Sequence, residues 1–196
     1  MNTSQKQAKD TLRSGPLQIG FRWHRDRFAH SISLFDSSRQ IPLLASREGN
    51  DEQKWPPIPV LQELHFEDHP TGMVALLVGS TKQSHYSLAI ATTDIGFSFD
   101  AACRLLNPTT PSVDDMCLQS GYRAMLQPVI RNTLPTVIEV GKVLMTVDDR
   151  SCCPPLAEGV AEDIAWRLTI MPQIIDENSK TVSWRYKIGI SEQHRG

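Results

Sequence analysis

Histidine and carboxylate side chains alternate along residues 63–69, ELHFEDH, in a pattern that could bind a metal ion. If this segment is a strand, four of its polar side chains share one face: Glu63, His65, Glu67 and His69. Imidazole and carboxylate groups are good ligands for zinc or iron. Residues two apart on a strand lie about 7 Å apart, so His65 with Glu67, or Glu67 with His69, could hold one ion.

A complete metal site would need a further ligand from another strand, because His65 and His69 lie about 14 Å apart on a regular strand. The histidines that could supply it are His24, His30 and His85. The same row is also typical of a solvated polar face beside a turn. We therefore keep a divalent metal at His65, Glu67 and His69, and a metal-assisted hydrolase that uses this row together with Glu63, as the alternative interpretation.

Arginines alternate with aromatic residues along 21–28, FRWHRDRF, a second pattern that could recognise a ligand. Arginine and aromatic side chains together can grip phosphates and stack on bases. The chain has 20 lysines and arginines against 22 aspartates and glutamates, a net charge of -2, which argues against a nucleic-acid binder. The segment also fits a β-hairpin whose outer face carries Arg22 and His24. We predict these two side chains as contacts for a small ligand or a protein partner.

Trp55 precedes Pro56-Pro57 at the end of residues 36–57, a stretch rich in Ser, Gly, Asn and Pro. We predict a long loop here, and long loops in compact domains are often functional. Trp55 could close over a ligand or contact a partner, which makes it the third predicted ligand-binding residue.

Motifs of the common enzyme classes are missing from the sequence. It has no G-x-S-x-G, no G-x-G-x-x-G, no G-x-x-x-x-G-K-[ST] and no H-E-x-x-H. The four cysteines, Cys103, Cys117, Cys152 and Cys153, have no C-x-x-C and no zinc spacing, and Cys103 is expected inside a sheet. These absences favour a non-catalytic binding function.

Alternation of apolar and polar residues predicts the strands that must position these groups. Residues 1–15 are polar and are predicted as a flexible N-terminal tail, so that residues 16–196 form a single β-rich domain. Strands over 17–24 and 27–34 would form a hairpin. Four further strands are typical of an antiparallel meander: 60–66, 72–79, 85–91 and 97–105. The second of these, GMVALLVG, is apolar throughout, which is typical of a strand buried on both faces.

The C-terminal part of the chain also has the pattern of β structure. The β-branched residues of 136–147 predict one long strand bent at Gly141. Two strands with strict alternation, 164–170 and 182–190, predict a hairpin. The helical signals are limited to short turns, one at Ser112 and one after Pro155.

The predicted fold class is therefore mainly β, with α+β as an alternative and at most two short helices. Periodicity does not choose between an antiparallel sandwich and a barrel. With 196 residues, 40% of them hydrophobic, the chain can bury a core without a disulfide or a metal. Its N-terminus has no secretory signal and no segment reaches the ~20 apolar residues of a membrane span, so we expect a cytoplasmic protein.

Three segments of the central third resemble an uncharacterised bacterial protein family: WPPIPVLQELHFE (55–67), ALLVGSTKQSHYSLAI (75–90) and FDAACRL (99–105). The resemblance implies no activity. The function predicted from the residues is that of a non-catalytic β domain that binds a small ligand or a protein partner. Pairing of exposed strands between copies, giving a homo-oligomer, is a further option.

Overall fold

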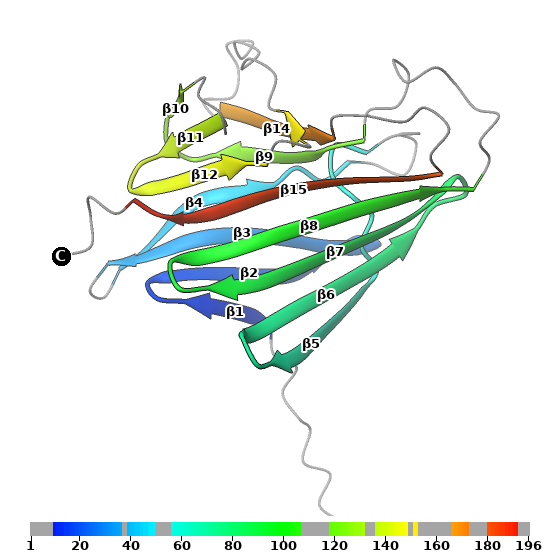
Figure 1. The fold of residues 1–196 in the computed structure, drawn as a ribbon, viewed down its shortest axis with the longest axis horizontal. Coiled ribbons are helices and arrows are strands. Elements are labelled where there is room, and N and C mark those ends of the chain that lie inside the picture. The colour runs from blue at the N-terminus through cyan, green and yellow to red at the C-terminus, as the bar shows by residue number, and fades with distance from the viewer. Residues whose placement is uncertain are drawn as a thin grey trace, which may run out of the picture.

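Two antiparallel β-sheets face each other and do not close into a barrel (Figure 1). The structure is a computed structural model that describes residues 10–36, 39–49, 56–106, 118–131, 136–148, 151–152, 166–172 and 180–191. Within these ranges it contains strands and no helix. The prediction of a mainly β, antiparallel fold is confirmed, and of the two architectures that the sequence left open the sheets form the sandwich.

The two sheets have seven and eight strands. The spatial order in the first is β1 (Thr11–Ser14), β2 (Leu17–His24), β3 (Arg27–Asp36), β4 (Arg39–Ser46), β9 (Ser120–Ala124), β14 (Trp166–Pro172) and β13 (Ser151–Cys152). The order in the second is β10 (Pro128–Arg131), β11 (Thr136–Val140), β12 (Val143–Val147), β15 (Thr181–Ile190), β8 (Gly96–Leu105), β7 (Ser84–Thr93), β6 (Gly72–Ser80) and β5 (Glu63–His69).

The core lies between the sheets because every second residue of a strand points inward. In β15, Trp184, Tyr186 and Ile188 are buried, and the residues between them are exposed. Phe99 of β8 stacks on Tyr186 with ring centroids 4.5 Å apart. Tyr122 of β9 meets the same ring edge-on from the opposite sheet.

The β2–β3 hairpin and the meander β5–β8 are predicted correctly by alternation. Cys103 of β8 is buried, as expected. The prediction that residues 72–79 are buried on both faces of the sheet is wrong for the single chain. Ala75 and Leu77 of β6 face the core, whereas Val78 on the outer face is 42% exposed.

Residues 11–14 belong to the first sheet, where the sequence predicted part of a tail. Leu12 of β1 pairs with Ile19 of β2 and is buried. The Ser14 hydroxyl donates to the Thr93 carbonyl oxygen in the opposite sheet at 2.6 Å. A strand of four residues is too short to show a periodic pattern, so its one apolar residue gave no signal.

Residues 39–46 form β4 inside the stretch predicted as a loop over 36–57. A bulge explains the difference: Ile32 of β3 pairs with Leu44 and Ser33 pairs with Pro42, which leaves Leu43 as the extra residue. Leu43 and Leu44 are both buried, so the period-two pattern is broken. Proline is tolerated at a bulge, where the pairing hydrogen bonds are already interrupted.

β11 and β12 form a hairpin instead of the single bent strand predicted over 136–147. Val140 pairs with Val143, and Gly141 in the turn has a φ of 60°. Glycine adopts positive φ without a steric penalty, so it permits a full chain reversal as readily as a bend.

β14 and β15 lie in different sheets, so the hairpin predicted from 164–170 and 182–190 is wrong. β14 pairs with β9 and β13, and β15 pairs with β12 and β8. Alternation identifies a strand with one buried face but does not identify its neighbour. Both sheets of a sandwich need such strands.

Trp55 and the helical turns predicted at Ser112 and after Pro155 lie outside the described residues. No helix in the described ranges has the length and apolar character needed to cross a bilayer.

Candidate functional site

A hollow of about 620 Å³ opens on the outer face of the first sheet, over β2, β3, β4 and β9. Four small residues form its floor: Gly20, Ala29, Ser31 and Ala45. Four long polar side chains stand around it: Arg22, His24, Arg47 and Arg123. We call these eight residues the arginine hollow.

The strand register explains why small residues and arginines meet on this face. One row of outward residues crosses the sheet in the order Gly20, Ser31, Ala45, Arg123 and Arg167. The inward neighbours of this row, such as Ile19 and Ile32, are buried in the core. The row begins with small side chains and ends with two guanidinium groups. The surface is therefore shallowly recessed over the small residues and basic beside them.

Three arginines with like charge lie close together on this face: Arg47, Arg123 and Arg167. Arg123 and Arg167 are direct cross-strand partners, and two like charges in that position are destabilising. Arg47 is half-buried beside them, and its backbone N–H donates to the Gly121 carbonyl oxygen at 2.9 Å. Burial, followed by the charges of Arg167 and Arg123, lowers the pKa of Arg47. An anion bound between these groups would relieve the repulsion through charge-assisted hydrogen bonds.

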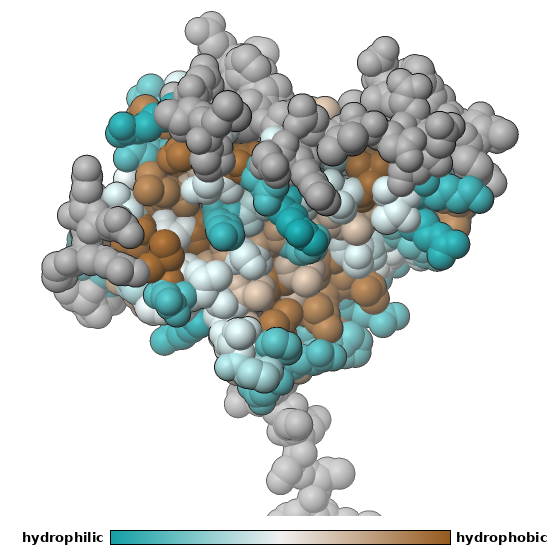
Figure 2. Space-filling model, viewed as in Figure 1, coloured by the Kyte–Doolittle hydropathy of each residue, from teal (hydrophilic) through white to brown (hydrophobic). Residues whose placement is uncertain are grey.

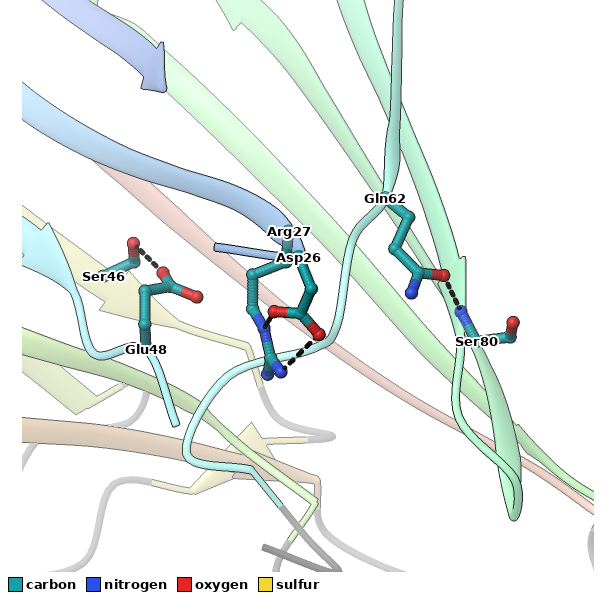
Figure 3. Close-up of polar contacts among 6 residues, drawn as sticks. All are labelled: Asp26, Arg27, Ser46, Glu48, Gln62 and Ser80. Atoms are coloured by element: carbon teal, nitrogen blue, oxygen red, sulfur yellow. Dashed lines mark hydrogen bonds and ion pairs between the residues drawn. The ribbon is translucent and has the colours of Figure 1, made fainter. Parts of the chain in front are cut away.

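Glu48 adds one carboxylate at the margin of the hollow. The Ser46 hydroxyl accepts a hydrogen bond from the backbone N–H of His30 at 2.9 Å. It donates one to Glu48 Oε1 at 2.5 Å (Figure 3). Burial raises the pKa of Glu48, and the Ser46 hydrogen bond opposes that shift. The charge of Arg27 also lowers this pKa and that of Asp26 raises it. Figure 3 shows the Glu48 carboxylate turned towards these two residues at the tip of the β2–β3 hairpin.

Arg27 at that tip is only 3% exposed and is neutralised by its neighbour Asp26. Its Nε and Nη2 atoms donate to the two carboxylate oxygens at 2.8 and 3.0 Å (Figure 3). A buried guanidinium is stable only with such a partner. The buried segment 56–61 runs beside the pair, and the Leu61 carbonyl oxygen accepts the Phe28 N–H at 2.7 Å. Arg27 therefore fixes the hairpin tip next to the hollow.

Gln62 anchors the end of this segment on the second sheet. Its side-chain oxygen accepts a hydrogen bond from the Ser80 backbone N–H at 3.1 Å (Figure 3). Its backbone N–H donates to the Val78 carbonyl oxygen at 2.7 Å. Residues 56–62 thus connect the sheets at this end of the sandwich.

A buried chain of hydrogen bonds lies behind the hollow. His30 Nε2 is 2.9 Å from the Tyr122 hydroxyl, which is 2.5 Å from the Tyr186 hydroxyl. Burial lowers the pKa of His30 to about 4 and raises the pKa values of Tyr122 and Tyr186. All three groups are therefore uncharged at neutral pH. They hold β9 in place, and β9 presents Arg123, the next residue after Tyr122, on the opposite face.

The structure brings two of the three predicted ligand-binding residues, Arg22 and His24, to the same hollow. The third, Trp55, lies outside the described residues. Sequence reasoning missed Arg47 and Arg123, which join Arg22 through the strand order β2-β3-β4-β9. These three arginines are so far apart in the sequence that no local pattern indicates that they lie close together in the fold.

The row predicted to bind metal lies on β5, the edge strand of the second sheet. His65 Nε2 is 3.7 Å from Glu63 Oε2, and both side chains are exposed. On the neighbouring strand, His65 faces Leu76 and Glu67 faces Val74, so β6 offers no ligand. In the part of the chain that the structure describes, no three His, Cys, Asp or Glu side chains gather as a metal site.

The remaining histidines of the metal hypothesis lie elsewhere. His69 Nδ1 is 3.0 Å from the Thr71 hydroxyl. His24 and His30 belong to the first sheet, and His85 pairs with Ser80 in the second. None of the three is a cross-strand partner of the β5 row in the described registers.

No protein-family model matches this chain, and no significant match to a curated protein was found. The resemblance of residues 55–67, 75–90 and 99–105 to an uncharacterised bacterial family stays a prediction.

Proposed function

We propose that this chain is a non-catalytic binding domain and that the arginine hollow takes a small anionic ligand. The observation that carries the proposal is the convergence of three arginines, Arg22, Arg47 and Arg123, on one hollow in which the Arg47 side chain is half-buried. Guanidinium groups bind carboxylate and phosphate oxygens in a planar, two-pronged geometry. A ligand with two or more negative charges would bridge Arg47 and its neighbours.

The size of the hollow supports a small molecule as the ligand. Its volume of about 620 Å³ lies within the range of roughly 300–1,000 Å³ found for small-molecule sites. Gly20, Ala29 and Ala45 leave the backbone accessible, so a flat ligand could lie against the sheet. The net charge of -2 favours a compact anion over a nucleic acid. The proposal includes a cytoplasmic location, where a free thiol such as that of Cys103 stays reduced.

Isothermal titration calorimetry with inorganic phosphate, pyrophosphate and citrate tests this proposal. We expect at least one of them to bind at low ionic strength and to bind more weakly at about 0.2 M salt, because screening reduces charge attraction. Arg47→Gln should weaken binding about tenfold, the loss of one charge-assisted contact worth ~1.4 kcal/mol. Arg104→Gln is the matched control, since Arg104 is exposed on the other sheet. The proposal fails if no anion binds, or if both variants bind alike.

The metal-assisted hydrolase remains a separate hypothesis that no observation in the described ranges favours. The same calorimeter separates it from the proposal. A transition metal that binds the purified protein, with an affinity lost in His65→Ala and kept in Arg47→Gln, would support the β5 row instead.

A further inference from the structure

The outer face of β6 is apolar although it faces away from the core. Its outward residues are Val74, Leu76 and Val78, and Val78 is 42% exposed. The outer face of an antiparallel sheet is normally polar. Figure 2 shows apolar surface over this part of the second sheet. The sequence pattern of β6 is thus that of a strand buried on both faces, and one chain buries only one of them.

The neighbouring strands make this face flat. The outward residues of β7 that pair with β6 are small: Ser87, Ala89 and Ala91. On β8 the small Ser98 and Ala102 flank Asp100, whose charge is paired with Arg185. Small side chains of this kind allow a second sheet to approach at the usual spacing of about 10 Å.

Opposite charges flank the flat area. The register runs from Glu67 on β5 through Val74, Ala91 and Ser98 to Lys187 on β15. Glu63 accompanies Glu67 on the acidic side. On the basic side the charge comes from Lys187, because Arg185 beside it is already ion-paired with Asp100 of β8 at 2.7 Å. β7 lies midway between β5 and β15. A two-fold axis along β7 would therefore set Glu67 of each copy over Lys187 of the other.

We propose that this face is where a second copy of the chain docks, forming a two-fold dimer through the outer sides of β5–β8 and β15. Five strands spaced about 4.8 Å apart and paired over about 25 Å present roughly 600 Å² of face, close to the ~800 Å² per partner of a standard interface. The charge pattern is self-complementary, which favours a second copy over an unrelated partner.

The dimer leaves both arginine hollows open, because they lie on the opposite sheet. The docking proposal is therefore independent of the proposed function. Loss of dimerisation should not change anion binding, and loss of anion binding should not change dimerisation.

Sedimentation equilibrium of the full chain tests the proposal. We expect a dimer that dissociates on dilution. Glu67→Lys and Lys187→Glu should each raise the dimer dissociation constant about tenfold or more, since each places like charges opposite one another. The double variant E67K/K187E restores complementary charges and should return the constant to within about threefold of the original. Leu76→Asp should abolish the dimer, because the same two-fold axis places residue 76 over Asp100 of the other copy and would set two carboxylates opposite one another.

Arg39→Glu is the control, an equal charge change at an exposed residue of the first sheet. It should leave the dissociation constant unchanged, and circular dichroism should show that every variant is folded. A monomer at about 100 µM protein would overturn the proposal. So would a dimer that the single variants leave intact, or one that the double variant fails to restore.

Discussion

The Tyr122 hydroxyl lies 2.5 Å from the Tyr186 hydroxyl, and this contact joins the two sheets in the middle of the core. Tyr122 also meets His30 Nε2 at 2.9 Å. Close by, Trp184 Nε1 donates to the Ser120 hydroxyl at 2.8 Å. These buried polar contacts fix β9 against β15, because a shifted register would leave their atoms unpaired. The position of Arg123 on the outer face depends on that register.

Removing the Tyr122 hydroxyl should destabilise the protein more than removing that of Tyr186. Tyr122→Phe breaks both contacts and should cost about 2–3 kcal/mol, whereas Tyr186→Phe leaves Tyr122 with His30 and should cost about 1 kcal/mol. Urea unfolding at neutral pH measures both. Tyr86→Phe is the control, because the buried Tyr86 hydroxyl has no partner at hydrogen-bond geometry among the described residues and takes no part in the Tyr122–Tyr186 contact. Equal costs for all three variants would contradict this ranking.

His30 should make the protein less stable as the pH falls. Burial lowers its pKa from 6.5 to about 4 in the folded state. Between these values the unfolded chain takes up a proton that the folded chain does not, so the free energy of unfolding decreases as the pH drops. The loss should reach about 3 kcal/mol below pH 4. His30→Gln cannot titrate, so its urea unfolding at pH 7, 5.5 and 4.5 should lack this part of the slope. Parallel slopes for both proteins would assign the effect to other groups.

The Cys103 thiol should resist alkylation in the folded protein. It is buried, and burial raises its pKa to about 11, so the reactive thiolate is rare at pH 8. Iodoacetamide followed by peptide mass spectrometry should modify Cys103 only after denaturant is added. Rapid modification under native conditions would show that β8 opens readily.

Gly79→Ala should be strongly destabilising, because an added Cβ would lie 2.1 Å from the Val60 carbonyl oxygen. Residues 56–62 would have to move away from β6, at a cost of about 2–3 kcal/mol. Gly20→Ala is the matched control, since the nearest atom to its Cβ is Ser31 Oγ at 3.7 Å. That change should be neutral or stabilising by about 0.5 kcal/mol. Thermal unfolding distinguishes the two, and equal shifts would contradict the close approach at Gly79.

Arg47→Gln should increase the stability of the unliganded protein. The change removes a charge that stands beside Arg123 and Arg167, so their repulsion decreases. The melting temperature should rise at low salt, and the gain should shrink at high salt because screening already weakens the repulsion. A lower melting temperature at low salt would mean that Arg47 stabilises the fold. A stability gain combined with a loss of anion binding is the pattern expected of a functional site.

Alternation of apolar and polar residues determined the strands and the fold class. The pattern of Trp184, Tyr186 and Ile188 identifies β15, and the same rule identifies β2, β3 and the meander. Arg22 and His24 could be selected as ligand contacts because they share one face of a predicted hairpin. Local sequence was sufficient for these inferences because period-two burial is a local property.

Only the tertiary structure decided which strands far apart in the sequence are neighbours. Residues 166–172 and 181–190 have similar patterns yet belong to different sheets. The bulge at Leu43 interrupts the alternation of β4, so the sequence pattern did not reveal that strand. Arg47 and Arg123 reach Arg22 only because β4 and β9 continue the sheet that starts with β1. The pairing of distant strands depends on how both sheets share one core, and no short stretch of sequence contains that information.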